Sequence, residues 1–205
     1  MTKLYALDVS NLDWQEILPQ LPVFRQEKVQ KLRKIEDKAR SAGAGWLLQY
    51  ALEQAGVQKP IFAETPLGKP YLENYPRIHF SLSHSGSWAV CAVGDAPLGV
   101  DVELPRCTMD IAKRFFRPEE LPKTENKDHL LRLWTAKEAF LKAIGTGLTL
   151  SPDSFRVVLG ENEAKIEQNF SKFSYYLQEF SLGESRICLC ATEKAEDLEI
   201  IKSTP

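Results

Sequence analysis

The sequence has 205 residues, of which 43% are hydrophobic and 26% charged, and its formal net charge at pH 7 is -2. A chain of this length and composition can bury a core as one large domain or two small ones. Because positive and negative charges nearly balance, the chain has no overall attraction to nucleic acid, and an anionic ligand must meet local clusters of lysine and arginine.

The N-terminal sequence MTKLYALDVSNLDW contains no basic segment followed by an apolar one, and no run of about 18 apolar residues occurs in the chain. We therefore expect a cytoplasmic protein that is neither secreted nor membrane-spanning. The four cysteines form no C-x-x-C pair, so we expect small buried side chains, not disulfides or zinc ligands. They are Cys91, Cys107, Cys188 and Cys190.

The first half of the chain alternates extended and helical patterns. The predicted elements, in chain order, are a strand at residues 3–9, helical segments at 13–18 and 25–32, a long helix at 37–54, and extended segments at 61–63, 78–83 and 88–93. The long helix is expected to end near Gly56, and the sequence PLGKP predicts a turn after the first extended segment.

From residue 98 the order of elements begins again. The predicted elements are a strand at 99–103, helical segments at 109–115 and 118–121, a long helix at 128–144, and strands at 155–159, 174–180 and 186–191. We predict an α+β fold of two similar α/β subdomains, residues 1–97 and 98–205, each a long helix packed on a small, mainly antiparallel sheet. The short link GDAPLG favours tightly packed halves, with a ligand site in the cleft between them.

Valine and acid alternate in the sequence GVDVE, residues 99–103. This pattern predicts a strand with Asp101 and Glu103 on one face, where the two carboxylates repel each other unless a cation or metal compensates them. An exposed edge strand is the alternative, since acids there are harmless. On the helix at 128–144, Trp134, Glu138 and Lys142 lie along one stripe, which predicts either a surface ion pair or a third carboxylate meeting the first two. Three carboxylates suit a hard cation such as Mg²⁺.

The sequence FSLSHSG, residues 80–86, predicts a strand that ends in a polar turn carrying His84. A lone histidine is more often structural than functional. A Ser–His hydrolase is excluded, because no G-x-S-x-G motif is present and adjacent residues of a strand point to opposite faces.

Taken together, these segments resemble the Sfp-type 4′-phosphopantetheinyl transferases. The family pattern G-[VI]-D-[VI]-E followed by W-[ST]-x-K-E-[AS]-x-x-K is matched by residues 99–103 and 134–142, with RFF between them and LGKP and FSLSHSG before them. The resemblance is strong over about residues 65–158 and extends to the N-terminal third in outline. It implies a pseudo-dimer of the two subdomains, with coenzyme A in the cleft.

The resemblance also implies an enzyme that transfers 4′-phosphopantetheine from coenzyme A to a serine of an apo acyl or peptidyl carrier protein, releasing 3′,5′-ADP. It assigns a Mg²⁺ ion, or Mn²⁺ in its place, to Asp101, Glu103 and Glu138. The ion would neutralise charge on the pyrophosphate, the main need in phosphoryl transfer. The protein is expected to act as a monomer, without nucleic acid or membrane.

The same resemblance assigns coenzyme A contacts to several further residues. It places Lys142 and His84 on the phosphates, a hydroxyl of Ser83 beside them, and Lys69 near the substrate. For the 3′-phosphate, the family uses basic residues before and within the first long helix, which Lys28, Lys31 and Arg40 match loosely. A solvated basic helix face is an equal alternative for those three.

Glu138 and Lys142 are the expected catalytic residues. Glu138 is the first candidate to accept the serine proton, directly or through metal-bound water, and Glu120 is a distant second. Lys137 lies on another face of the helix and is expected either to orient Glu138 or to contact the carrier.

A mixture of apolar and basic residues at 111–127 suits the acidic helix that carriers of this family present. It contains Ile111, Phe115, Phe116, Leu121, Lys113, Arg114, Arg117 and Lys123. Two alternative functions are a metal-dependent phosphoesterase or nuclease and a non-catalytic module that binds carriers or coenzyme A. A nuclease should show a basic stripe with interleaved aromatics, and a non-catalytic module should have lost one of the acids or Lys142.

Overall fold

The alternating apolar pattern of the first half produces one sheet and a long helix that covers it, in a computed structural model that describes residues 2–122, 124, 126–160 and 164–201. The elements are β1 (Thr2–Asp8), α1 (Trp14–Ile17), the 3-10 helix η1 (Leu18–Gln20), α2 (Val23–Lys31), α3 (Ile35–Gln54), β2 (Phe62–Glu64), β3 (Pro70–Leu72), β4 (His79–Ser85) and β5 (Trp88–Gly94). Strands β1, β5 and β4 pair antiparallel in that order, and β2 and β3 form a separate hairpin.

The second half repeats this order of elements. They are β6 (Leu98–Glu103), α4 (Met109–Phe115), η2 (Pro118–Glu120), α5 (Lys127–Ile144), η3 (Gly147–Thr149), η4 (Pro152–Ser154), β7 (Arg156–Leu159), β8 (Ala164–Glu167), β9 (Tyr176–Leu182), β10 (Ser185–Ala191) and β11 (Ala195–Ile201). The sheet order β6-β10-β9 corresponds to β1-β5-β4, and all of these pairs are antiparallel. The predicted α+β class is confirmed.

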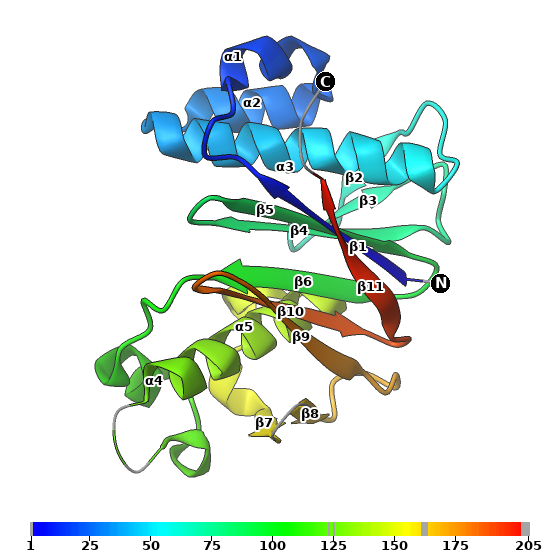
Figure 1. The fold of residues 1–205 in the computed structure, drawn as a ribbon. Helices are drawn as coiled ribbons and strands as arrows, with labels where there is room; N and C mark the ends of the chain where they lie inside the picture. Colours follow the sequence, from blue (N-terminus) through cyan, green and yellow to red (C-terminus); the bar gives the residue numbers. More distant parts are fainter. Residues whose placement is uncertain (1, 123, 125, 161–163, 202–205) are drawn as a thin grey trace.

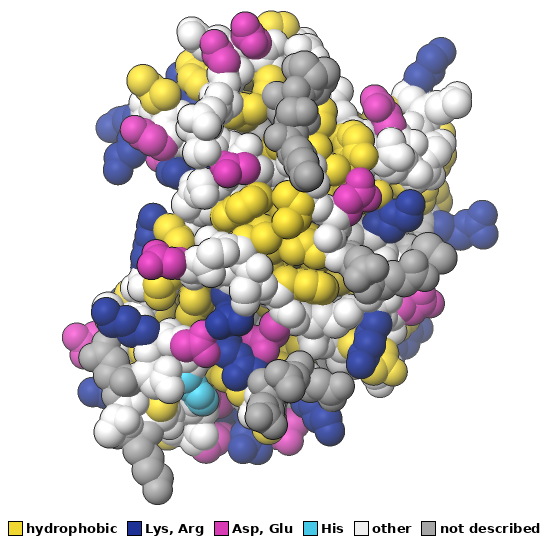
Figure 2. Space-filling view, viewed as in Figure 1, with side chains coloured by type: hydrophobic (Ala, Val, Ile, Leu, Met, Phe, Trp, Pro, Cys, Tyr) yellow, Lys and Arg dark blue, Asp and Glu magenta, His cyan; other side chains and the backbone are white. Residues whose placement is uncertain are grey.

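The molecule is layered as helix, sheet, sheet, helix (Figure 1). One core cluster lies between α3 and the first sheet, and another between α5 and the second sheet. A third cluster lies between the two sheets and joins residues of β1 and β5 to residues of β6 and β10. In Figure 2, hydrophobic side chains form a patch in the middle of this face, where the two sheets meet in Figure 1, with charged side chains around it.

The last described strand breaks the repeat. β11 crosses from the second half and pairs in parallel with β1, so the first sheet has the order β11-β1-β5-β4. β11 therefore joins the sheet of the first half, although it follows the boundary predicted between residues 97 and 98.

Most predicted elements are present with shifts at their ends. Strands β3, β8 and β11 were not predicted, because they are short or rich in charged residues. All four cysteines are free, three of them buried and Cys107 half-buried, as expected. Within the described residues, no helix is both long and apolar enough to cross a membrane.

Candidate active site

Helix α5 packs very closely on β6 because residue 99 is a glycine. A Cβ atom at Gly99 would lie 2.1 Å from the carbonyl oxygen of Ala139 and 2.3 Å from the amide nitrogen of Ala143. Only a residue without a side chain permits this approach of helix to strand. The close packing brings Glu138 and Lys142 of α5 to the face of β6 that carries the acids.

On that face, Lys142 and Asp101 form a short ion pair. The Lys142 Nζ lies 2.6 Å from Asp101 Oδ1 and donates to Ser83 Oγ at 2.9 Å. Ser83 in turn donates to Asp101 Oδ1 at 2.8 Å. The other oxygen, Asp101 Oδ2, is buried and has no hydrogen-bond partner among the described residues. Three of the predicted site residues are therefore in direct contact, and one carboxylate oxygen is left unsatisfied.

Glu103 and Glu138 lie close enough to Asp101 to affect each other's ionisation. Burial, followed by the negative charge of Asp101, raises the pKa of both glutamates above the ordinary value, and Lys142 partly offsets this effect. The three predicted metal ligands thus form one electrostatically coupled group with a single nearby lysine.

Alternate serines of β4 connect this group to the first half. β4 and β6 are edge strands of their sheets, and side chains link them. Ser81 Oγ accepts from the amide of Val100 at 3.0 Å, and Ser85 donates to Glu103 Oε2 at 2.9 Å. Together with the bond from Ser83 to Asp101, these contacts mean that Ser81, Ser83 and Ser85 of β4 each hydrogen-bond to a residue of β6. Of these three serines, only Ser83 was predicted to contribute to the site.

Leu82 and His84, which alternate with these serines on β4, face the helices of the first half, where several lysine and arginine side chains lie. Burial, followed by the positive charges of Arg25, Lys28, Lys142 and Arg40, lowers the pKa of His84 to about 4. Arg25, Lys28 and Arg40 lie on α2 and α3, and these three cations near a neutral imidazole make this wall of the cleft, the basic wall, strongly positive. Such a wall favours an anionic ligand.

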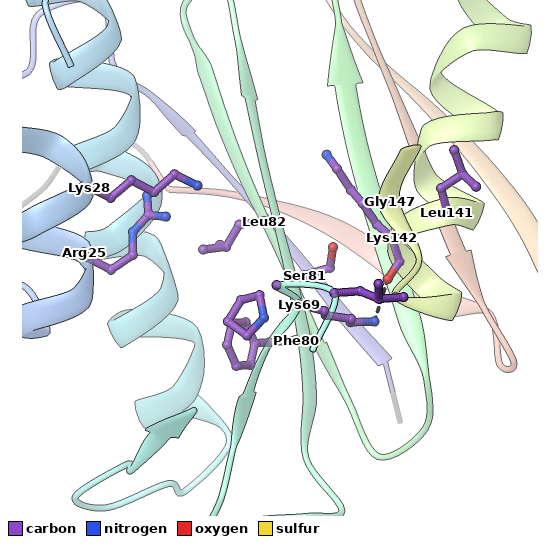
Figure 3. A pocket seen from close by; sticks show the side chains of 13 residues that line it. Arg25, Lys28, Lys69, Phe80, Ser81, Leu82, Leu141, Lys142 and Gly147 are labelled. Carbon is purple, nitrogen blue, oxygen red and sulfur yellow. Dashed lines mark hydrogen bonds between the residues drawn. The ribbon is translucent and has the colours of Figure 1, made fainter. Parts of the chain in front are cut away.

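A cavity of about 230 Å³ lies beside these groups, and its lining includes Arg25, Lys28 and Lys142 but not His84 or the three acids. In Figure 3, Arg25 and Lys28 project from one side, and Lys142 lies on the opposite side with Ser81 between them. The turn with Gly68 and Pro70 and the end of α5 complete the lining. The lining residues therefore come from both halves of the chain.

The remaining predicted coenzyme A contacts divide into those near the cavity and those away from it. Lys28 lines the cavity, and Arg40 donates to the carbonyl of Gly86 and pairs with Asp37. Lys31 is exposed and is not part of the cavity lining. The structure therefore brings Lys28 to the cleft and gives no support to a coenzyme A contact by Lys31.

Lys69, predicted to lie near the substrate, has protein partners at the cavity. Its side chain lines the cavity, but its ammonium group donates to the carbonyls of Leu98 at 3.1 Å, Lys142 at 2.6 Å and Ala143 at 3.0 Å. Burial lowers the pKa of Lys69 to about 8. Its three donors hold the end of α5 against the start of β6, so they are engaged by the protein and not directed at a substrate.

Glu120 and Lys137 were also assigned wrongly. The two side chains are fully buried and form an ion pair of 2.8 Å, and Glu120 also accepts from the amides of Arg117 and Val157. Lys137 donates to the carbonyls of Pro152 and Phe155. Glu120 therefore cannot serve as a base in the cleft, and Lys137 neither orients Glu138 nor reaches a carrier. The pair instead ties α5 to the segments before β7.

Arg25 is the residue of the cleft that the sequence analysis missed. It is 4% exposed and lines the cavity. Its position on α2, one turn before Lys28, was the only sign that Arg25 could reach the cleft. A charged residue in a basic segment, however, usually lies on a solvated surface.

The acidic wall, formed by Asp101, Glu103 and Glu138, fits a divalent cation in its donor chemistry. It offers carboxylate oxygens, one of them a buried Asp101 oxygen without a partner, and hard cations such as Mg²⁺ prefer such ligands. Among the described residues, no three His, Cys, Asp or Glu side chains converge to form a ready-made metal site. The fit of a divalent cation to this wall therefore rests on the negative charge and the oxygen ligands of the carboxylates.

Comparison with known proteins agrees with this arrangement. The profile of the 4'-phosphopantetheinyl transferase superfamily matches residues 97–191, which include the acidic wall. A 4'-phosphopantetheinyl transferase of Bacillus subtilis is 38% identical over 151 residues, which cover 67% of this chain and 66% of the relative. The transferase Sfp of Bacillus subtilis strain 168 is 32% identical over 164 residues, covering 75% and 72%. The transferase psf-1 of Bacillus pumilus is 28% identical over 220 residues, covering 97% and 94%. The chain therefore belongs to the 4'-phosphopantetheinyl transferase superfamily, as a transferase of the Sfp type.

Proposed function

We propose that this chain transfers the 4′-phosphopantetheine group of coenzyme A to a serine of an apo carrier protein. The observation that carries the proposal is a cavity lined by Arg25 and Lys28 on one side and by Lys142 on the other, where Lys142 pairs with Asp101 of the coupled acids. Coenzyme A has matching chemistry, because its pyrophosphate can meet a metal and lysine while a second phosphate meets the basic wall.

In the proposed reaction, the serine oxygen attacks the phosphorus atom next to pantetheine. A new P–O bond forms to the carrier, and the bond from that phosphorus to the bridging oxygen breaks, so that 3′,5′-ADP leaves with the electron pair. Glu138 accepts the serine proton, for which its raised pKa suits it better than an ordinary carboxylate. Lys142 supports the negative charge that develops on the leaving group.

Asp101, Glu103 and Glu138 would hold a Mg²⁺ ion, which when bound supplies neutralising charge to the pyrophosphate. Ser83 and Ser85 contribute by holding the first two carboxylates in place. His84 is neutral and can donate a hydrogen bond to a phosphate oxygen.

The carrier would dock on and around α4. Ile111 is 40% exposed, and Lys113 and Arg114 are exposed beside it. Arg117 is partly engaged, since its Nε donates to the carbonyl of Asp153. Lys123, which was expected in this surface, lies outside the described residues. An apolar centre with basic neighbours suits an acidic helix.

The proposal is tested by incubating the protein with coenzyme A, Mg²⁺ and a panel of apo carriers, followed by mass spectrometry of the carriers. We expect addition of phosphopantetheine to at least one carrier, and no addition to the same carrier with alanine in place of the acceptor serine. Glu138→Gln should slow single-turnover transfer by roughly 10² to 10⁴. Wild-type protein that modifies none of the carriers, or a Glu138→Gln variant with the wild-type rate, would contradict the proposal.

A further inference from the structure

Lys69 is a charged side chain whose partners are all main-chain carbonyls. Its ammonium group donates to the carbonyls of Leu98 at 3.1 Å, Lys142 at 2.6 Å and Ala143 at 3.0 Å. An ammonium group has three donors, so all of them are used. No carboxylate is among its partners in the described part of the chain. The backbone of two other segments therefore holds this charge in place.

Two of the three carbonyls belong to the last turn of α5. The last four carbonyls of an α-helix have no partner within the helix, and the helix dipole favours a positive charge beside them. Lys69 supplies both a donor and a charge, so it caps the end of α5 from outside the helix. Gly145, which follows α5, leaves room for the cap: its φ is +76°, and a Cβ atom there would lie 3.0 Å from Lys69 Cδ.

Lys69 reaches α5 from the other half of the chain. It lies just before β3, where its amide donates to Thr65 Oγ1 at 3.0 Å and its carbonyl accepts from the amide of Thr65 at 2.9 Å. Leu98 is the first residue of β6. One ammonium group therefore joins a closed turn of the first half to the start of β6 and the end of α5. Figure 3 shows its bond to Lys142 beside the cavity.

This junction lies close to the charged groups of the acidic wall. Lys142, whose carbonyl accepts the shortest bond from Lys69, carries the ammonium group that pairs with Asp101 at 2.6 Å. Glu138 lies one turn earlier on the same helix. Because both side chains are on α5 and Asp101 is on β6, a shift of the end of α5 would change the distances among all three.

We propose that Lys69 is a positioning residue for the transfer reaction: by capping α5 from the first half of the chain, its ammonium group fixes Lys142 and Glu138 against Asp101. The inference rests on the proposed function, which gives Lys142 and Glu138 their roles in transfer. Lys69 acts through the helix and not on the substrate, so its effect should appear in the rate of transfer more than in the affinity for coenzyme A.

The ionisation of Lys69 supplies a readout that a neutral contact would lack. Burial lowers the pKa of Lys69 to about 8, and loss of the proton removes the charge and one of the three donors. His79 of β4 and Cys190 of β10 interact electrostatically with Lys69. Both stay neutral near pH 8, because burial lowers the pKa of His79 and raises that of Cys190. The other cations of the cavity lining are Arg25, Lys28 and Lys142. Burial also lowers the pKa of Lys28, so variants of Lys69 itself are needed to assign a change near pH 8.

The test compares Lys69→Met and Lys69→Arg with wild type in single-turnover transfer from about pH 6.5 to about pH 9.5, with coenzyme A and carrier at saturation. Lys59→Met is the matched control, because Lys59 is an exposed lysine of the same half and is not part of the cavity lining. Calorimetry of coenzyme A binding separates affinity from turnover, and thermal unfolding reports whether each variant folds. If Lys69→Met does not fold, Lys69→Arg, which keeps the charge, carries the comparison of pH profiles.

We expect Lys69→Met to lower the transfer rate at neutral pH by about 10- to 100-fold, because a displacement of about 1 Å in a catalytic group can cost about 100-fold. Coenzyme A affinity should fall by a smaller factor, since methionine keeps the apolar part of the cavity lining. The wild-type rate should fall as the pH rises through about 8. This fall should be absent in Lys69→Met and should move to higher pH in Lys69→Arg, whose guanidinium stays charged. Lys59→Met should match wild type. A wild-type rate in Lys69→Met, or the same fall near pH 8 in that variant, would overturn the assignment.

Hydrogen exchange separates this inference from the proposed function. In the ligand-free protein, the amides of residues 142–150 should exchange faster in Lys69→Met than in Lys59→Met, because the end of α5 has lost its cap. If wild-type protein transfers nothing to any carrier and this difference is present, the proposed function is contradicted while the placement of α5 by Lys69 is supported. Equal exchange in the two variants would contradict the cap.

Discussion

At the scale of single residues, the ionisation of His84 decides how the basic wall works. Burial and the nearby cations lower the pKa of His84 to about 4. The imidazole is therefore neutral between pH 5 and pH 8, and it can donate to a phosphate without adding a positive charge. Since the unfolded chain takes up this proton near its ordinary pKa of about 6.5, the folded state loses stability as the pH falls from about 6.5 towards 4.

This behaviour gives a prediction about titration. We expect the imidazole proton signals of His84 in NMR spectra of the ligand-free protein to stay constant from pH 8 to pH 5. Bound coenzyme A should raise the pKa of His84, because a phosphate beside the ring stabilises the charged form. His84→Asn should remove part of the loss of unfolding free energy between pH 6.5 and pH 4. A titration midpoint near 6.5 without ligand would show that the ring is not surrounded by these cations.

At the scale of elements, the contact between α5 and β6 depends on Gly99. In a Gly99→Ala variant the new methyl group would overlap the backbone of Ala139 and Ala143, and backbone cannot rotate away as a side chain can. Helix α5 must then move off the strand and take Glu138 and Lys142 with it.

We expect Gly99→Ala to lower the single-turnover transfer rate by about 100-fold, because a displacement of about 1 Å in a catalytic group can cost that much. Coenzyme A affinity should fall less, since the basic wall on α2 and α3 is unaffected. The two measurements are rapid-quench transfer and calorimetry, with circular dichroism as the control for folding. A variant with unchanged transfer would mean that the helix accommodates the methyl group without moving the site.

The elements that sequence patterns predicted are those in which apolar periodicity is strong. Helix α5 and strands β5 and β10 bury nearly every inward residue, so their patterns are clear. Strand β11, with the sequence AEDLEII, carries acids and gains its structure from pairing with β1. Long-range pairing of this kind leaves no local signal, and β3 and β8 were too short to give one.

The same reasoning explains which site residues were predictable. Asp101, Glu103, Glu138 and Lys142 fall on regular elements whose spacing brings them to one face, and their motifs are specific. The burial of Arg25, Glu120 and Lys137 was not predictable, because charged side chains usually lie on the surface. Lys69 could be placed near the cleft, but its three carbonyl partners come from segments distant in sequence.

At the scale of the whole molecule, the two halves share the core cluster between the sheets. Leu189 of β10 is fully buried in this cluster and lies opposite Val100 of β6. We expect Leu189→Ala to lower the free energy of unfolding by about 2–5 kcal/mol, the range for truncating a buried leucine. Because residues of both sheets form the cluster, both halves should unfold in one transition.

The measurement is denaturant unfolding followed by fluorescence in variants that retain a single tryptophan, either Trp46 on α3 or Trp134 on α5. The two probes should report the same midpoint, and Leu189→Ala should shift both midpoints equally. Separate midpoints would show that each half is stable by itself and that the shared core contributes little.

The parallel pairing of β11 with β1 has a consequence for the way the protein is made. On the ribosome, residues 2–8 emerge before residues 195–201, so β1 can pair with β5 while its second neighbour has not yet been synthesised. One edge of β1 therefore stays open through most of translation, and an open strand edge is a site for unwanted pairing with other chains. The growing chain should depend on chaperones or on fast synthesis until its last strand closes that edge.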